Sequence, residues 1–198
     1  MEGILSWLST NWIEVSGVII SLIYLYFSVK QIIWLWPFGL LSALFYIWIY
    51  FSSGLYADMG LQVYYVGISI YGWYQWTRKE TRNSEKPELI VSHIKLNTGI
   101  ILLLVFLVLW LIISQLLIRF TNSEVPVMDA LTTAGGIVAT WMLARKILEH
   151  WILWIILDAI SIGLYIYKGL FATVVLFTVY TLMAIVGYIS WRKELHKE

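Results

Sequence analysis

The sequence predicts an all-α integral membrane protein with seven transmembrane helices. Hydrophobic residues make up 61% of the chain, only 13% of its residues are charged, and the mean hydropathy is +0.81. A soluble domain of this composition would have too little polar surface. The length of the apolar runs is the second observation, because about 20 residues cross the roughly 30 Å of bilayer hydrocarbon. An internal repeat of these runs is the third.

Seven apolar runs have the length of a membrane span. We predict helices at residues 12–29, 34–52, 57–76, 98–119, 127–144, 149–167 and 170–190. The fifth run is the weakest of these predictions, because Thr132, Thr133, Gly135 and Gly136 dilute it. A charged, polar connection at residues 77–97 follows the third run. We therefore expect a three-helix unit at 1–76, a loop plus a linker helix at 77–126, and a second three-helix unit with a tail at 127–198.

The two three-helix units resemble each other at a constant offset of 115 residues, without gaps. The pairs include Trp36 with Trp151, Tyr50 with Tyr165, Gly54 with Gly169, Tyr65 with Tyr180, Gly72 with Gly187, and Trp76 with Trp191. Units of the same orientation need an odd number of crossings between them, and the fourth span supplies one. The sequence thus predicts a 3+1+3 plan with parallel repeats, as in one class of transporters. We expect the paired glycines Gly54 and Gly169 to form turns with unusual backbone angles.

The distribution of the thirteen Lys and Arg residues predicts the orientation. An outside N-terminus and a cytoplasmic C-terminus leave only Arg119 and Lys168 on the outer side. The other eleven are then cytoplasmic: Lys30, Arg78, Lys79, Arg82, Lys86, Lys95, Arg145, Lys146, Arg192, Lys193 and Lys197. Such an excess agrees with the positive-inside rule. The net charge of +1 gives no electrostatic basis for binding nucleic acid.

An acidic residue inside the sixth span is the main candidate for a binding group. Helical spacing places Trp151, Trp154, Asp158, Ser161 and Tyr165 near one face, so two indoles lead to a carboxylate. Ionisable groups in membrane helices are costly and usually face a cavity or a partner. Aromatic rings beside an anion favour an organic cation as the ligand. The structural alternative is a buried Asp158 held by tyrosine hydroxyls and Ser161.

Other polar and aromatic residues allow both a functional and a structural interpretation. Gln62 in the third span either lines the pocket or joins two helices by a hydrogen bond. Trp36 and Trp141 either line a cavity or pack and anchor. Asp58 and Asp129 lie at predicted helix starts, where an acid is favourable in any case. No metal-ligand spacing or catalytic motif is present in the sequence, so we expect no metal, no cofactor and no catalytic residue, although intramembrane catalysis by Asp158 with Asp58 stays an alternative.

Five sequence motifs are distinctive when taken together. They are Trp36-Pro-Phe-Gly39, the run from Leu55 to Tyr65, the run from Tyr71 to Trp76, Trp151-x-x-Trp154-x-x-x-Asp158, and the run from Leu164 to Leu170. Together these motifs resemble the PnuC family of bacterial vitamin transporters. The resemblance covers nearly the whole chain. It implies a seven-helix fold related to sugar transporters of the SWEET type, a bacterial inner-membrane location, and usually a homotrimer.

The resemblance also implies a function and a set of site residues. It implies facilitated diffusion of an unphosphorylated vitamin, most often nicotinamide riboside, with a cytoplasmic kinase that traps the product. Thiamine is the alternative, since family members with thiamine as substrate also resemble this chain, and an intramembrane enzyme or a sensing scaffold are the other classes. The substrate site of the family corresponds here to Trp151, Trp154, Asp158 and Gln62. Our candidate substrate-binding residues are these four together with Trp36, Tyr65, Trp141, Ser161 and Tyr165.

Overall fold

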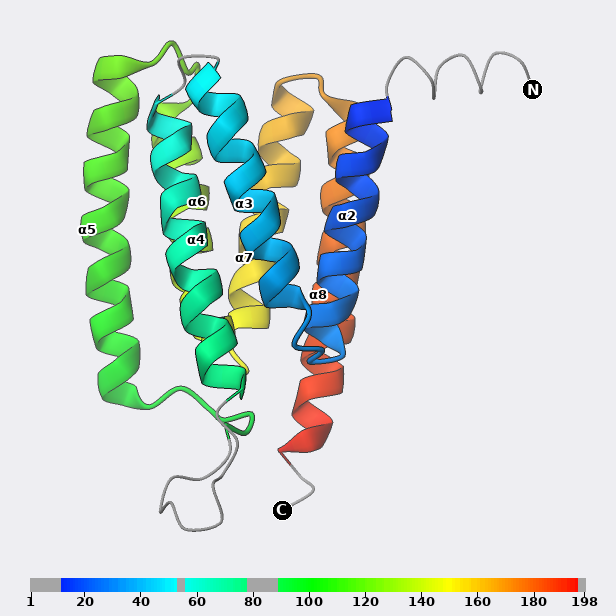
Figure 1. The fold of residues 1–198 in the computed structure, drawn as a ribbon. Helices are drawn as coiled ribbons and strands as arrows, with labels where there is room; N and C mark the ends of the chain where they lie inside the picture. Colours follow the sequence, from blue (N-terminus) through cyan, green and yellow to red (C-terminus); the bar gives the residue numbers. More distant parts are fainter. Residues whose placement is uncertain (1–11, 53–55, 78–88, 196–198) are drawn as a thin grey trace.

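A computed structural model describes residues 12–52, 56–77 and 89–195, and this part of the chain is almost entirely helical (Figure 1). It contains seven helices: α2 (Trp12–Val29), α3 (Leu35–Ser52), α4 (Tyr56–Thr77), α5 (Leu96–Phe120), α6 (Pro126–Ala144), α7 (His150–Tyr167) and α8 (Phe171–Glu194). The predicted spans agree with these helices to within two residues at most ends, and α8 continues four residues further than predicted. The first helix begins and the last helix ends at opposite ends of the bundle (Figure 1).

Four of the described helices are long and apolar enough to cross a membrane. They are Leu96–Phe120, Pro126–Ala144, His150–Tyr167 and Thr173–Glu194. The helix α5 has the highest hydropathy of the four, and most of its side chains are exposed in the isolated chain. The helix α6 has the lowest hydropathy and the largest buried share. Gly135, Gly136 and Thr140 of this helix are buried against other helices, which explains why the span is weak by hydropathy alone.

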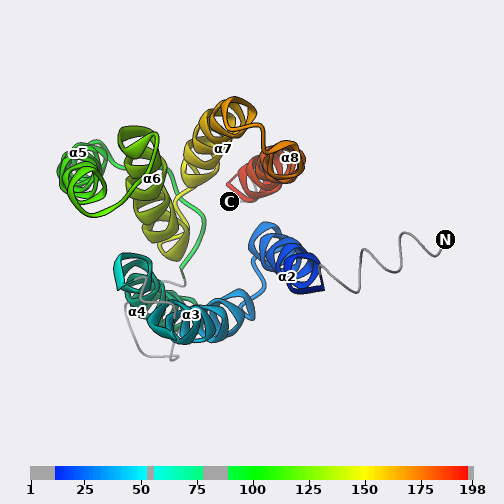
Figure 2. The same ribbon diagram turned by 90° about the horizontal axis from the view of Figure 1, so that it is seen from above.

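The helices form two arcs that face each other. Seen along the bundle, α2, α3 and α4 make one arc, α6, α7 and α8 make the other, and α5 lies outside beside α6 (Figure 2). The arcs touch where α2 meets α8 and where α4 meets α6. Inside each arc the closest packing is between its second and third helices, α3 with α4 and α7 with α8.

Two turns at the same end of the bundle have the same geometry. Gln31 follows α2 with a φ of 53°, and Lys146 follows α6 with a φ of 52°. The amide after each turn donates across it, Ile32 to the Phe27 carbonyl at 2.8 Å and Ile147 to the Met142 carbonyl at 3.0 Å. All three pairs differ by 115 residues. We call this end of the bundle, where Arg145, Lys146 and Arg192 lie, the basic end.

The predicted glycine turns differ in what the structure describes. Gly169, between α7 and α8, has a φ of +71°, which agrees with the predicted unusual backbone angle. Gly54 lies outside the described residues.

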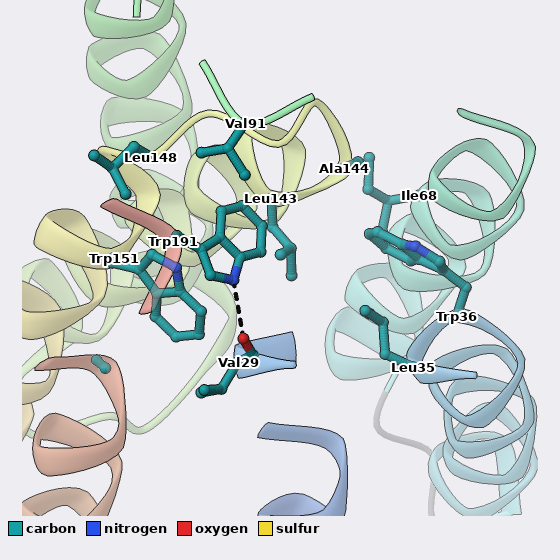
Figure 3. Close-up of a cluster of buried hydrophobic side chains, with 11 residues drawn as sticks. Val29, Leu35, Trp36, Ile68, Val91, Leu143, Ala144, Leu148, Trp151 and Trp191 are labelled. Atoms are coloured by element: carbon teal, nitrogen blue, oxygen red, sulfur yellow. Dashed lines mark hydrogen bonds between the residues drawn. The ribbon is translucent and has the colours of Figure 1, made fainter. Parts of the chain in front are cut away.

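A cluster of buried hydrophobic side chains, three of them tryptophans, lies at the basic end (Figure 3). Trp36, Trp151 and Trp191 are each at most 1% exposed. The Trp191 indole N–H donates to the carbonyls of Ser28 and Val29, each at 3.2 Å, and so fastens α8 to the end of α2. The Trp151 and Trp191 rings also contact each other edge to face, and such a contact adds about 0.5–1.5 kcal/mol beyond the burial of the rings. The cluster therefore holds the two arcs together at this end.

Candidate substrate-binding cavity

A cavity of about 430 Å³ lies between the two arcs. All helices of the two arcs contribute to its lining, and α5 does not. Its volume is within the range of small-molecule sites, which are commonly about 300–1,000 Å³. Because each arc supplies one wall, a movement of one arc against the other would change the shape and access of this cavity.

The floor of the cavity is formed by a matched pair of tryptophans, Trp36 from α3 and Trp151 from α7. Each ring packs against a glycine on the next helix, Trp36 against Gly72 and Trp151 against Gly187. A Cβ atom at either glycine would lie only 2.4–2.6 Å from ring carbons. The small residue is thus what allows each indole to lie flat against the neighbouring helix and complete the floor.

Below this floor the aromatic contacts continue toward the basic end. Trp76 makes an edge contact with Trp36, with ring centroids 5.5 Å apart, and Trp191 makes one with Trp151 at 5.7 Å. Trp76 and Trp191 themselves lie 6.3 Å apart. The floor tryptophans from the two arcs are therefore connected through a continuous set of rings.

The wall formed by α7 carries the candidate binding groups. Trp154 and Asp158 both line the cavity, one turn apart on the same face. The Trp154 ring lies close to Gly136 of α6, where a Cβ would be 3.5 Å away. The Asp158 side chain is mostly enclosed, since the residue is only 5% exposed. A planar aromatic surface and a carboxylate are thereby presented to the same space.

The α4 wall contributes Gln62 and Tyr65. The neighbouring Tyr64 hydroxyl donates to the Ile137 carbonyl of α6 at 2.7 Å, which fixes the rotation of α4 against the second arc. The rings of Tyr64 and Tyr65 pack edge to face, with centroids 5.5 Å apart. This packing holds Tyr65 on the cavity side.

Six of the nine residues predicted for the site line this cavity, and three do not. The six are Trp36, Gln62, Tyr65, Trp151, Trp154 and Asp158. Trp141 packs at the basic end, where the Arg145 guanidinium lies 5.9 Å from its ring centroid. Ser161 is buried beyond the cavity, and Tyr165 packs against Phe177 with ring centroids 5.1 Å apart. The structure thus separates these three from the group around Asp158.

Sequence reasoning missed several residues of the lining. Tyr24, Tyr46, Phe177 and Tyr180 add aromatic surface. Tyr180 had a usable signal, because it is the partner of Tyr65 at the 115-residue offset. Its hydroxyl interacts with Ser21 on α2, and it lies within electrostatic range of Asp158 and Tyr46. Phe177 and Tyr46 are likewise the partners of Gln62 and Ser161 at this offset, although the paired residues differ in type, and Tyr24 had no distinguishing signal.

The charge of the cavity is one-sided. Asp158 is the only Asp, Glu, Lys, Arg or His residue in the lining that the structure describes. Within those same residues no group of His, Asp and Glu side chains is arranged to hold a metal ion. A cavity with one carboxylate and several aromatic rings is complementary to an organic cation.

These features define a class of protein, a multi-pass membrane carrier for a small molecule, with a binding cavity between two helical arcs. Residues 11–193 match the nicotinamide mononucleotide transporter family, and the chain belongs to this family. Its similarity to individual proteins agrees with the class. It is 27% identical to the nicotinamide riboside transporter PnuC of Escherichia coli (strain K12), over 91% of this chain and 85% of the relative.

Two further comparisons extend the picture. The chain is 24% identical to the riboflavin/roseoflavin transporter RibM of Streptomyces davaonensis, over 91% of this chain and 84% of that protein. The crystal structure of the vitamin B3 transporter PnuC superposes with a TM-score of 0.71 at 21% identity, over 98% of this chain and 86% of that one. The fold is therefore that of the PnuC structure. The family places the chain among multi-pass inner-membrane proteins.

Proposed function

We propose that this protein carries nicotinamide riboside across the bacterial inner membrane by facilitated diffusion. The observation that supports this most is the cavity, in which Trp154 and Asp158 face the same space and no basic residue lines the described part. Nicotinamide riboside is a flat pyridinium cation with an uncharged sugar. A ring stacked on Trp154 gains roughly 0.5–2 kcal/mol, and Asp158 complements its charge.

The absence of basic residues from the described lining favours the riboside over the mononucleotide. A phosphate group carries about two negative charges at neutral pH and is normally bound by Arg, Lys or backbone N–H groups. In this cavity it would meet the Asp158 carboxylate instead. The substrate is therefore unphosphorylated, and a cytoplasmic kinase that phosphorylates it would prevent its return.

Thiamine is the second candidate substrate. Its thiazolium ring is also a flat cation, so Trp154 and Asp158 satisfy the same requirement. An uncharged vitamin such as riboflavin gains no charge attraction from Asp158. Charge and stacking thus favour flat organic cations as ligands. A binding comparison of nicotinamide riboside with thiamine distinguishes the two candidates.

We infer that transport takes place by rocking of two structural repeats, α2–α4 and α6–α8, joined by α5. The equal turns at Gln31 and Lys146 and the equal Trp–Gly contacts of the cavity floor support this 3+1+3 plan, which the SWEET-type transporters share. The rings of Trp36, Trp76, Trp151 and Trp191 pack between the two arcs at the basic end. Alternating access requires this cluster to separate while the opposite end closes.

The orientation and assembly complete the proposal. The basic end is cytoplasmic by the positive-inside rule, so the N-terminus is outside and the C-terminus inside. The protein acts as a carrier and not as an enzyme, and it forms a homotrimer. Uptake into proteoliposomes without a kinase would then equilibrate the substrate and leave it chemically unchanged. Accumulation driven by an ion gradient, or a modified product, would contradict the proposal.

A binding titration tests the site directly. Purified protein is titrated with nicotinamide riboside, thiamine and riboflavin. For the preferred cation, Trp154→Ala is expected to weaken binding roughly 2- to 30-fold, which is the value of one cation–aromatic contact. Asp158→Asn keeps the shape of the side chain and removes its charge, and it is expected to weaken the cations selectively. Trp34→Ala is the matched control, because Trp34 is 60% exposed and outside the cavity. If the wild type and both site variants bound a cation equally well, the assignment of Trp154 and Asp158 to the binding site would be wrong.

A further inference from the structure

The two walls of the cavity differ in their hydroxyl groups. The first arc contributes four serines to the lining, Ser21, Ser28, Ser42 and Ser69. The second arc contributes no serine and one threonine, Thr140, together with Trp154 and Asp158. The 115-residue partners of Ser42 and Ser69 are Leu157 and Ala184, so the repeat itself does not produce this difference. One wall is rich in hydroxyls and uncharged, and the other is aromatic and acidic.

Three of these serines, Ser28, Ser42 and Ser69, have side chains with no hydrogen-bond partner among the residues that the structure describes. Ser28 is the last residue but one of α2, at the basic end, whereas Ser42 and Ser69 lie on the neighbouring helices α3 and α4. The residue Ser69 is 95% buried, since it is only 5% exposed. By contrast, the Thr140 hydroxyl donates to the Gly136 carbonyl at 2.7 Å, and the Ser21 side chain is paired with Tyr180.

A glycine keeps the Ser69 hydroxyl uncovered. Gly39 on α3 faces α4, and a Cβ atom there would lie 3.2 Å from the Ser69 Oγ. The partner of Gly39 in the second arc is Trp154, a large side chain that fills its own wall. The missing side chain at Gly39 therefore leaves room beside Ser69, one turn along α3 from Ser42. The Ser69 hydroxyl is not among the fully enclosed polar atoms, so it is open to the cavity, where a ligand or water can bind it.

We propose that Ser42 and Ser69 are specificity-determining residues that bind the hydroxyl groups of a sugar, while Trp154 and Asp158 bind the cationic ring. This inference rests on the proposed function and adds the orientation of the substrate. A serine hydroxyl both donates and accepts, as a sugar hydroxyl does, so the two groups can exchange hydrogen bonds in either direction. The ligand lies across the cavity, with its sugar against α3 and α4 and its ring against α7. A substrate with several hydroxyls is thereby favoured over thiamine, which has one.

The test compares two ligands that share the ring and differ in the sugar. Nicotinamide riboside and 1-methylnicotinamide, in which a methyl group replaces the ribose, are titrated into the wild type, Ser42→Ala and Ser69→Ala. Each lost hydrogen bond is expected to weaken the riboside about 3- to 10-fold. Binding of 1-methylnicotinamide is expected to stay unchanged. Ser114→Ala, on α5 outside the cavity, is the matched control for both ligands.

A second variant keeps the result interpretable if the serine variants unfold. Gly39→Ala covers the Ser69 hydroxyl without removing it and is also expected to weaken the riboside alone. Equal weakening of both ligands, or of neither, in the serine variants and Gly39→Ala would overturn the assignment while leaving the proposed function intact. Binding of the riboside without any binding of 1-methylnicotinamide would overturn it as well, because the ring wall is assigned to act without the sugar. Failure of the wild type to bind either ligand would refute the proposed function itself.

Discussion

Replacement of Gly187 by alanine tests the floor of the cavity. A Cβ atom at this position would lie 2.5–2.6 Å from three carbons of the Trp151 ring. Ordinary carbon–carbon contacts are about 3.5–4.0 Å, so the approach is short by roughly 1 Å. The ring cannot move aside easily. It is 1% exposed, and the His150 ring lies 4.5 Å away. The Trp191 ring lies beside it at 5.7 Å (Figure 3).

The expected cost follows from this enclosure. Overpacking of a closed core costs about 1–3 kcal/mol, and alanine returns up to about 1 kcal/mol through its higher helix propensity. Gly163→Ala isolates the second effect, because Gly163 is helical and nothing lies within 4 Å of its added Cβ. The difference between the two variants therefore measures the clash alone. For a chain of this length it corresponds to roughly 2–12 °C in the unfolding midpoint.

Thermal unfolding in detergent, followed by tryptophan fluorescence, gives this difference. Gly187→Ala is expected to unfold at a lower temperature than Gly163→Ala and to bind substrate more weakly, because Trp151 lines the cavity. Gly72→Ala should behave in the same way, since its Cβ would lie 2.4–2.5 Å from the Trp36 ring. Equal midpoints for Gly187→Ala and Gly163→Ala would refute the packing argument.

Two contacts at the basic end give further predictions. Trp191→Phe keeps an aromatic ring but removes the indole N–H that donates to the carbonyls of α2. We expect the free energy of unfolding to fall by about 0.5–1.5 kcal/mol, measured by thermal unfolding. An unchanged unfolding midpoint would show that these hydrogen bonds do not hold α8 to α2. Glu149 accepts hydrogen bonds from the Ile94 amide at 2.9 Å and pairs with His93 at 2.7 Å. Because His93 is exposed, its ion pair with Glu149 contributes little, and the hydrogen bond from the Ile94 amide contributes more. Glu149→Gln keeps an acceptor for that amide, so it should be more stable to unfolding than Glu149→Ala. Equal losses of stability in the two variants would assign the stabilisation to the ion pair instead.

The helices were predictable from the sequence because a bilayer imposes their length. All seven predicted spans are helices in the described structure, including α6, which threonines and glycines dilute. Its composition has a packing reason that hydropathy alone does not reveal. A Cβ at Gly135 would lie 2.5 Å from the Leu157 side chain, so the helix needs a small residue where it meets α7. Small residues lower the hydropathy of such a span, and here they indicate a helix that packs against other helices on several sides.

The cavity was predictable only in part because a helical face is longer than the site it borders. Helical spacing correctly grouped Trp151, Trp154 and Asp158, which line the cavity. The same spacing added Ser161 and Tyr165, but α7 continues past the cavity, and Tyr165 there packs on Phe177 of α8. The packing of α8 against α7 decides which α7 residues reach the cavity. The sequence pattern of α7 alone contains no information on that packing. Ser42 and Ser69 of the opposite wall had no sequence signal for the same reason, since the packing of α3 against α4 brings them to the cavity.

The 115-residue repeat relates some features of the two arcs and not others. The turns at Gln31 and Lys146 and the contacts of Trp36 and Trp151 with their glycines are the same in both arcs. If the two arcs rock as proposed, such equal turns and equal floor contacts would let each arc make the same movement. At Gly39 and Ala43, however, the second arc has Trp154 and Asp158. A ligand with a charged ring at one end and a sugar at the other has no symmetry of its own, so its two walls must differ. We infer that substitutions at the shared positions alter transport rate and stability together, whereas those at the unshared positions alter which ligand binds.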